Sequence, residues 1–335
     1  MRRVAIVGAT GAVGQELCRV LQRRQFETGE VRLFASPRSV GRTVEGVRGP
    51  ATVAALGPEA FAGVDVAFFS AGGAVSREYA LQAREAGALV IDNSSAFRLD
   101  NDVPLVVPEV NPETLRHHRG IIANPNCSTI ILAVVLWPLR QLGTIRRVVV
   151  STYQAVSGAG ARGLAELEVQ TRAVLAGEAP RPEVFPVPCA FNVFSHNSPV
   201  DADGLNLEER KLILETCKIF GDNELRIAPT CMRVPVMRAH TESVTVEFDQ
   251  PVTVERARAL LYRAPGLRLV DDPAADRFPT PLDAANVDDV LVGRVRHDPS
   301  VRDERGLQLI CSGDQLLKGA ALNAVQIAEL AAGGS

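Results

Sequence analysis

The sequence NPNCST at residues 124–129 places a cysteine where a helix is expected to begin. Pro125 disfavours helical backbone at the residue before it, and asparagine is common directly before a helix, so Cys127 is expected in the first turn of an apolar helix. The unpaired N–H groups and the positive end of the helix dipole favour a thiolate there. We therefore predict that Cys127 is a nucleophile for acyl transfer. The alternative is a buried structural cysteine.

A second group of residues with a chemical role is the glycine-rich sequence GATGAVG at residues 8–14. It follows an apolar run at residues 4–7 and precedes a helical pattern at residues 15–24. Glycines at this spacing permit a tight turn and let backbone N–H groups approach a pyrophosphate at the helix N-terminus. The residues that we expect to bind a dinucleotide are Gly8, Thr10, Gly11, Ala12, Val13 and Gly14.

The end of the second expected strand, residues 31–35, should hold the adenosine ribose of this dinucleotide. NAD sites usually have an acidic residue there, but the sequence LFASPRS at residues 33–39 contains none. Arg38 could instead bind a 2′-phosphate through charge-assisted hydrogen bonds, with Ser39 beside it. The sequence therefore favours NADP. The alternative for Arg38 is an ordinary exposed loop arginine.

Composition excludes several classes of protein. Apolar residues make up 46% and charged residues 22% of 335 residues, which is typical of a globular protein of two domains. The net charge of −3 predicts neither a nucleic-acid partner nor an anionic membrane surface. The apolar run at residues 130–137 is too short to span a membrane, which takes about 20 residues. The N-terminus enters a strand pattern without a signal-peptide pattern.

The cysteines predict a reducing environment. Six are scattered along the chain without C-x-x-C pairs or partnering histidine spacings. Neither a disulfide framework nor a metal site is therefore predicted. We expect a cytoplasmic protein.

The hydrophobic pattern predicts an α/β protein with two domains. In the first region, strands are expected at residues 4–7, 31–35, 64–70, 88–92, 105–107 and 120–123, with helices at 15–24 and 76–86. Fully apolar strands that alternate with amphipathic helices indicate a doubly wound, Rossmann-type parallel sheet covered on both faces.

The second region predicts an α+β domain on an open, mixed or antiparallel sheet. Its strands are expected at residues 146–153, 226–235, 240–248, 290–297 and 307–312. Its helices are expected from residue 127 onward, at residues 164–175, and at residues 207–219, where Asn206 is a plausible cap. A last helix is expected at residues 316–331.

The chain resembles the aspartate-β-semialdehyde dehydrogenase family almost from end to end. The resemblance is carried by GATGAVGQEL (8–17), SAGG (70–73), IDNSSAFR (91–98), PLVVPEVN (104–111), NPNCST (124–129), YQAVSGAG (153–160), EERK (208–211), RVPVMRAH (233–240) and GDQLLKGAALNA (313–324). It implies the NADPH-dependent reductive dephosphorylation of L-aspartyl-4-phosphate to L-aspartate-4-semialdehyde. This reaction is a step toward lysine (through diaminopimelate), methionine and threonine.

The resemblance also assigns the catalytic residues. Cys127 is the nucleophile that forms a thioester. His240 is implied as general acid and base, with a pKa in the neutral range suited to proton transfer. Gln154 is implied to orient the substrate near the cysteine; without the resemblance it could equally be a loop glutamine bonded to backbone.

Four charged residues are implied to bind the substrate. Arg98 and Lys211 match phosphate ligands of the family, Arg233 the arginine that binds the α-carboxylate bidentately, and Glu208 the partner of the α-amino group. Glu208 and Lys211 lie three residues apart on one expected helix, so both can face one cleft. Such a pair is otherwise commonly a solvated surface pair.

Three further residues are implied to lie near the nicotinamide: Ser157, Gly158 and Gln315. For the remaining histidines, at positions 117, 118, 196 and 297, a surface or capping role is expected. Arg238, two residues before His240, has no role that the sequence assigns.

The resemblance further implies discontinuous domains and an oligomer. Residues 1–126 with 316–335 would bind NADP, and residues 127–315 would bind substrate, catalyse the reaction and dimerise. A homodimer is expected, with the sheet of the second domain as the contact; a tetramer made of two such dimers is the alternative.

Three other functions share part of this pattern. An N-acetyl-glutamyl-phosphate reductase usually carries an NPGCY-like motif instead of NPNCST. A short-chain dehydrogenase needs a Y-x-x-x-K pair, which none of Tyr79, Tyr153 and Tyr262 provides. A non-catalytic NADP-binding paralogue should lack the cysteine or the histidine, and both are present.

Overall fold

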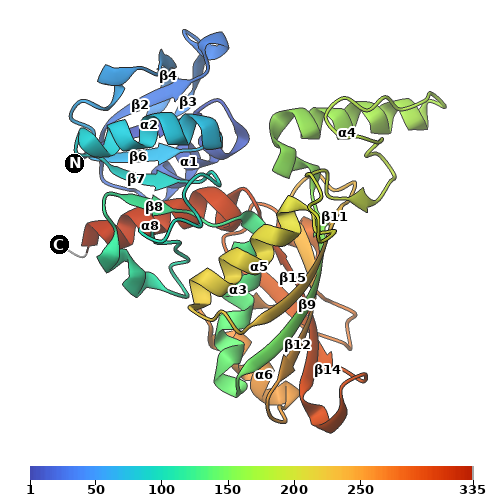
Figure 1. Ribbon diagram of the computed structural model, residues 1–335. Helices are drawn as coiled ribbons and strands as arrows, with labels where there is room; N and C mark the ends of the chain where they lie inside the picture. The colour runs from blue at the N-terminus through green and yellow to red at the C-terminus, as the bar shows by residue number, and fades with distance from the viewer. Residues whose placement is uncertain (334–335) are drawn as a thin grey trace. The chain divides into compact units, whose positions relative to one another are not determined.

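The computed structural model describes residues 1–333 and divides into two compact units (Figure 1). The first unit contains residues 1–126 and the chain from Gly319 onward. The second contains Cys127–Lys318. Among the described residues, no helix is both long and apolar enough to cross a membrane.

The first unit is built on a six-stranded sheet whose neighbouring strands are all parallel, in the order β5-β2-β1-β6-β7-β8. The strands are β1 (Arg2–Val7), β2 (Thr28–Ala35), β5 (Ala54–Ala55), β6 (Val66–Phe69), β7 (Leu89–Asp92) and β8 (Ile121–Ala123). A separate hairpin joins β3 (Thr43–Gly46) to β4 (Gly49–Thr52).

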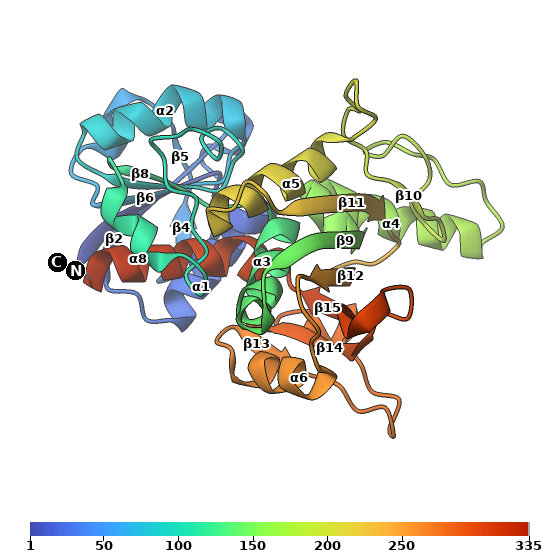
Figure 2. The same cartoon turned by 60° about the horizontal axis from the view of Figure 1, so that its bottom comes forward.

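Helices cover both faces of this sheet. Figure 2 shows α2 (Gly73–Glu85) on one face, with α1 (Ala12–Arg23) and α8 (Leu322–Gly333) on the other. The central strands β1 and β6 are apolar and buried over Val4–Val7 and Val66–Phe69 because neither of their faces meets solvent. The predicted doubly wound fold is confirmed.

The strand predicted at residues 105–107 is wrong. Only Leu105 forms a bridge, to Ala123. The N–H of Val106 still donates to the carbonyl of Ala123. Side chains bond the other backbone groups: Asn111 accepts the N–H of Val107 and donates to the carbonyl of Leu105, while Asn323 donates to the carbonyl of Val106. An apolar triplet therefore became a buried loop, because polar side chains satisfy the groups that a sheet would otherwise pair.

The second unit is built on a seven-stranded sheet in the order β10-β11-β9-β12-β15-β14-β13. β11 and β9 are parallel, whereas β9, β12, β15 and β14 pair antiparallel in that order, so the sheet is mixed, which is one of the predicted alternatives. The strands are β9 (Ile145–Gln154), β10 (Phe194–Ser195), β11 (Arg226–Arg233), β12 (His240–Phe248), β13 (Leu267–Leu269), β14 (Val290–His297) and β15 (Gly306–Gly313).

Helices cover one face of the second sheet. They are α3 (Cys127–Leu139), α5 (Leu207–Phe220) and α6 (Val254–Arg263). The short α7 (Pro281–Ala284) contacts β15, whereas α4 (Gly160–Leu175) lies apart from the sheet. α3 is buried from Ser128 to Leu136 because it packs between the sheet strands β14 and β15 and the helices α5 and α6. An apolar helix without a polar face is the consequence of that central position.

The N-terminus of α5 is held by a capping box, as the sequence predicted for Asn206. The Asn206 side chain accepts the N–H groups of Glu208 and Glu209, and the Glu209 carboxylate accepts the N–H of Asn206. Glu209 also accepts the N–H of Cys231 on β11. This cap places Glu208 in the first turn of α5, next to the sheet.

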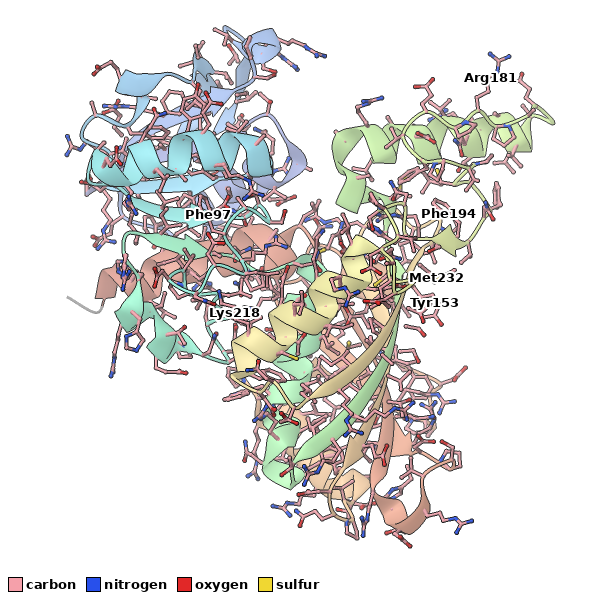
Figure 3. All side chains as sticks on the ribbon, in the orientation of Figure 1. Phe97, Tyr153, Arg181, Phe194, Lys218 and Met232 are labelled. Atoms are coloured by element: carbon pink, nitrogen blue, oxygen red, sulfur yellow. The ribbon has the colours of Figure 1, made fainter. Side chains whose placement is uncertain are left out.

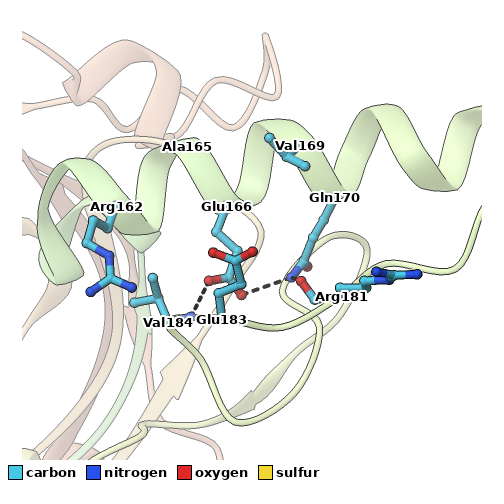
Figure 4. Close-up of a pocket in the computed structure, with 8 residues that line it drawn as sticks. All are labelled: Arg162, Ala165, Glu166, Val169, Gln170, Arg181, Glu183 and Val184. Atoms are coloured by element: carbon cyan, nitrogen blue, oxygen red, sulfur yellow. Dashed lines mark hydrogen bonds between the residues drawn. The ribbon is translucent and has the colours of Figure 1, made fainter.

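Helix α4 and the proline-rich segment after it form an arm of the second unit. Glu166 accepts the N–H of Val184, and Gln170 donates to Glu166 and to the carbonyl of Arg181 (Figure 4). A shallow cavity lies between the helix and the segment. None of the predicted site residues lines it, so the chemistry must be sought elsewhere in the unit.

Candidate active site

Cys127 and His240 are brought together in the second unit. Cys127 is the first residue of α3, as predicted, and His240 is the first residue of β12. The distance from Cys127 Sγ to His240 Nε2 is 3.5 Å. The half-buried sulfur therefore has a helix N-terminus on one side and an imidazole on the other, and both favour its thiolate form.

The hydrogen bonds of His240 assign its tautomer. The backbone N–H of Ala155 donates to Nδ1 at 3.0 Å, so Nδ1 is an acceptor and the proton of the neutral ring lies on Nε2, facing the sulfur. Burial, together with the charge of Arg233, lowers the pKa of His240 to about 3. The neutral-range pKa predicted from the sequence is therefore wrong for the free protein, because the ring is fully buried.

Gln154, at the end of β9, lies between the histidine and a charged pair. Its Nε2 lies 3.5 Å from His240 Nε2 and donates to Glu208 Oε1 at 3.1 Å, while its Oε1 accepts from Thr152. Lys211 Nζ lies 3.1 Å from Glu208 Oε2. The side chain of Glu208 is 5% exposed and that of Lys211 32%, so this pair lies at the site and is not a solvated surface pair.

Arg233 ends β11 directly opposite Gln154 in the parallel ladder. Its Nη1 donates to the carbonyl of Ala155 at 2.7 Å, and its guanidinium lies over the ring of Phe185. Nε is buried without a hydrogen-bond partner among residues 1–333. Burial lowers the pKa of Arg233, and the nearby carboxylate of Glu208 opposes that shift. A rigid, buried cation with an unused donor suits a planar anion.

His196 also belongs to this cluster, although a surface or capping role was predicted for it. Its Nε2 lies 2.9 Å from Arg233 Nη2 and its Nδ1 lies 3.1 Å from Ser198 Oγ. Because arginine only donates, Nε2 is the acceptor and Nδ1 carries the proton. Burial lowers the pKa of His196 to about 4. Its sequence neighbourhood carries no motif, so nothing local could have revealed this contact.

The residues predicted near the nicotinamide lie beside Arg233 and His240. A Cβ atom at Gly158 would be 3.1 Å from Arg233 Nη1 and 3.6 Å from His240 Cε1, so a side chain would crowd both. Gln315 donates to Ser157 Oγ and accepts the N–H of Ala239. Both ends of its amide therefore have protein partners.

The glycine loop in the first unit fits a dinucleotide. Gly8 has φ +92°, and a Cβ atom there would lie 2.7 Å from the backbone of Ser70. A Cβ atom at Gly14 would lie 2.2 Å from the carbonyl oxygen of Gly8. The helix that starts at Ala12 leaves the N–H groups of its first turn for a phosphate. This geometry suits the predicted pyrophosphate-binding loop.

Arg38 and Ser39 lie in a short 3₁₀ turn, Pro37–Ser39, directly after β2. Since β2 is the neighbour of β1, this turn follows the carboxyl end of the strand beside the glycine loop. Ser39 is buried and Arg38 is exposed. An exposed arginine at this position can meet a 2′-phosphate.

Arg98 is buried in the first unit. It donates from Nε to the carbonyl of Asn124 at 2.9 Å and from Nη2 to the carbonyl of Asn93 at 2.8 Å. Asn124 precedes Cys127 by three residues in the sequence. These two carbonyls fix the direction of the guanidinium.

Comparison with known proteins agrees with this architecture. Residues 3–118 match the semialdehyde dehydrogenase NAD-binding domain, and residues 136–318 match the semialdehyde dehydrogenase dimerisation domain. The aspartate-semialdehyde dehydrogenase of Synechocystis sp. is 52% identical over 328 residues, covering 98% of this chain and 96% of that protein. The enzyme of the same name from Bacillus subtilis is 47% identical, covering 97% and 96%.

Solved structures agree as well. The aspartate semialdehyde dehydrogenase II of Vibrio cholerae, complexed with ASA, has a TM-score of 0.96 at 44% identity and covers 100% of this chain and 99% of that one. The Candida albicans enzyme with NADP has a TM-score of 0.76 at 25% identity, covering 98% of each chain. The resemblance seen in the sequence motifs is confirmed, and the chain belongs to the aspartate-semialdehyde dehydrogenase family.

Proposed function

We propose that this protein reduces L-aspartyl-4-phosphate to L-aspartate-4-semialdehyde with NADPH, through a thioester on Cys127. Its family makes it an oxidoreductase of amino-acid biosynthesis. The observation that carries the mechanism is the position of Cys127 Sγ at the start of α3, 3.5 Å from His240 Nε2.

The first chemical step is attack by the Cys127 thiolate on the acyl carbon of the aspartyl phosphate. The C–S bond forms, and the C–O bond to phosphate breaks with its electron pair leaving on phosphate. His240 presents Nε2–H to the sulfur and can donate that proton to an oxygen or sulfur that gains negative charge. Gln154, whose side chain is fixed by hydrogen bonds to Glu208 and Thr152, would orient the substrate next to the cysteine.

When bound, NADPH would supply the hydride for the thioester carbonyl carbon. The C–S bond would then break, its electron pair returning to the Cys127 sulfur as the aldehyde leaves. The absence of a side chain at Gly158 leaves its backbone next to Arg233 and His240, which supports close approach of the nicotinamide to this backbone. Arg38 and Ser39 would hold the 2′-phosphate and so select NADP over NAD. The glycine loop would hold the pyrophosphate.

Charged side chains would bind the two ends of the substrate. Arg233 would bind the α-carboxylate and Glu208 the α-amino group, while Lys211 and Arg98 would bind the phosphate. The buried positions of Arg233 and Glu208 support this division, because a buried charge gains most from an ionic ligand.

We also propose a homodimer formed by the open face of the second sheet. Tyr153 and Met232 are neighbours in the β9–β11 ladder and lie side by side on that face (Figure 3), and Tyr153 is exposed. An exposed aromatic residue on a sheet face without covering helices is typical of an interface. Six free thiols support a reducing compartment such as the cytoplasm.

The test is phosphate-dependent reduction of NADP by L-aspartate-4-semialdehyde, with N-acetylglutamate semialdehyde as the control substrate. Cys127→Ala should abolish turnover and retain NADPH binding. Mass spectrometry of protein incubated with acyl phosphate should find the acyl adduct on the Cys127 peptide. An adduct on Cys217, the other half-buried thiol, would refute the mechanism.

A further inference from the structure

The residue directly before His240 has an unusual backbone conformation. Ala239 has φ +71°, in the left-handed region that L-residues other than glycine rarely adopt. It is fully buried, so solvent cannot stabilise it. Such a conformation persists only where surrounding contacts impose it. The direction in which β12 leaves Ala239, and with it the position of His240, therefore depends on those contacts.

Two consecutive residues after β15 supply the contacts. Gln315 Oε1 accepts the N–H of Ala239 at 2.8 Å. Asp314 Oδ2 accepts Arg238 Nε and the N–H of Asn286, each at 2.6 Å. Asn286 is itself left-handed, with φ +63°. Asp314 and Gln315 thus hold two left-handed residues from two other segments.

Asp314 is anchored on its other side. Its Oδ1 accepts the N–H groups of Leu316 and Leu317, so the carboxylate caps the turn that follows it. Its side chain is 0% exposed, whereas that of Arg238 is 20% exposed. A buried carboxylate with this many donors is rigid.

The same turn holds His240 itself. His240 pairs with Gly313 in the β12–β15 ladder, and Ser312 Oγ donates to the His240 carbonyl at 3.0 Å. A Cβ atom at Gly313 would lie 2.9 Å from Ile131 on α3, the helix that starts at Cys127. The segment 312–315 therefore contacts the histidine strand and the cysteine helix together.

We propose that Arg238, Asp314 and Gln315 are positioning residues for the known reaction: they lock left-handed Ala239 and thereby aim His240 at Cys127. This 314 lock, defined as these three side chains with the Ala239 backbone, gives Arg238 a role. It rests on the proposed function only in that His240 acts on Cys127. None of the three residues needs to touch substrate.

The first test is Asp314→Asn. The asparagine oxygen can still cap Leu316 and Leu317, but its NH₂ group then faces the donors of Arg238 and Asn286. The contacts of residue 314 with Arg238 and Asn286 should break, while its hydrogen bonds to Leu316 and Leu317 remain. We expect kcat to fall by about 10- to 100-fold, as for a catalytic group displaced by roughly 1 Å. The KM values for aspartate semialdehyde and phosphate should change by less than about 2-fold, because the Arg233 and Lys211 contacts are unaltered.

The chain contains a matched control beside the edge strand β13 of the same sheet. Asp271 Oδ2 accepts Arg258 Nε at 2.8 Å, and its Oδ1 accepts the N–H of Arg294 at 2.9 Å. Arg294 is left-handed, with φ +57°, and the Asp271 side chain is 1% exposed. Asp271→Asn therefore breaks the same kind of lock away from Cys127. It should lower the melting temperature as Asp314→Asn does, with kcat unchanged.

Rescue by glycine separates positioning from general stability. Glycine adopts positive φ without strain, so Ala239→Gly in the Asp314→Asn background should recover a large part of the lost kcat. Arg238→Met, which removes only the outer partner, should lower kcat in the same direction and provides a second variant if Asp314→Asn fails to fold. An unchanged kcat in folded Arg238→Met or Asp314→Asn, or no recovery with glycine, would overturn the proposal.

A readout without substrate distinguishes this proposal from the proposed function. The alkylation rate of Cys127 by iodoacetamide, followed on its peptide by mass spectrometry, depends on the aim of His240 Nε2–H at the sulfur. It should fall in Asp314→Asn and stay unchanged in Asp271→Asn. If the substrate assignment were wrong, wild-type turnover would be absent, yet this difference in alkylation would remain. Equal alkylation rates in both variants would count against the lock.

Discussion

The Nε2 atom of His240 lies 3.5 Å from the sulfur of Cys127, although 113 positions separate the two residues in the sequence. One begins a helix and the other begins a strand. The Ala155 N–H on the far side of the ring leaves the imidazole proton on the nitrogen that faces the sulfur. The pair therefore combines a nucleophile, Cys127, with a hydrogen-bond donor, His240 Nε2–H, that points at its sulfur.

The first prediction concerns the protonation of His240. Because its pKa in the folded state is lowered to about 3, the ring should stay neutral, with Nε2 protonated, from pH 8 to pH 5. The lowered pKa of His240 also makes the free energy of unfolding depend on pH. The stability that the neutral ring contributes is complete above its unfolded pKa of about 6.5 and is lost as pH falls toward 3. Two-dimensional NMR of ¹⁵N-histidine-labelled protein measures both tautomer and charge, and His240→Asn identifies the signal. A signal from His240 that titrates between pH 8 and 5 would contradict the assignment.

The second prediction concerns the choice of cofactor. Arg38→Ala should raise the KM for NADPH by about 10- to 150-fold, since a charge-assisted hydrogen bond contributes roughly 1.5–3 kcal/mol. The KM for NADH should change little, because NADH has no 2′-phosphate. Arg42→Ala, at an exposed position four residues further on, is the control. Equal effects of Arg38→Ala on both cofactors would show that Arg38 does not contact the 2′-phosphate.

The third prediction separates the two ends of the substrate. In the reverse direction phosphate is a free substrate, so Arg98→Leu and Lys211→Leu should mainly raise the KM for phosphate. Arg233→Leu should mainly weaken the use of aspartate semialdehyde. Arg233→Lys should restore it poorly, since an ammonium group cannot reproduce the two parallel bonds of a guanidinium. A near-normal kcat/KM for the semialdehyde in Arg233→Lys would rule out a bidentate contact.

The fourth prediction concerns a buried acid on the histidine strand. Glu242 is fully buried; its Oε1 has no partner among residues 1–333, and its Oε2 lies 3.9 Å from Cys311 Sγ. Burial raises the pKa of Glu242 well above its usual range. Its folded-state pKa therefore exceeds the unfolded value, so its contribution to stability is complete below about pH 4.3 and is lost as pH rises.

Glutamine has the shape of a protonated glutamic acid but does not titrate. Glu242→Gln should therefore not lose stability as pH rises. The variant should gain stability over wild type between pH 5 and pH 8, by about 1.4 kcal/mol per pH unit until the folded pKa is reached. Urea unfolding at the two pH values measures the difference. Glu247→Gln, on the opposite face of the same strand, is the control. A stability difference between wild type and Glu242→Gln that does not change with pH would show that the carboxyl is charged in the fold.

Several features were predictable because local rules decide them. The start of α3 at Cys127 follows from the proline two residues before it, and the cap of α5 follows from Asn206 and Glu209 three residues apart. The tight glycine turn follows from the spacing of Gly8 and Gly14, since no other residue fits against the neighbouring backbone. The motifs also indicated the family, and the hydrophobic pattern indicated the two sheets.

Other features depend on segments that are distant in the sequence. Leu105–Val107 is apolar enough for a strand, but Asn111 and Asn323 take its backbone groups. His196 joins the site only because β10 pairs with β11 and brings it to Arg233.

The sequence by itself determined which residues could do chemistry and where the elements begin, because capping, glycine conformation and hydrophobic periodicity act within a few residues. Only the tertiary structure decided the charge of His240 and the role of Arg238. The first depends on complete burial beside Arg233, and the second on Asp314, 76 residues away. The pKa of a side chain and the strain of a backbone depend on the groups packed around them, and these groups come together only when the chain folds.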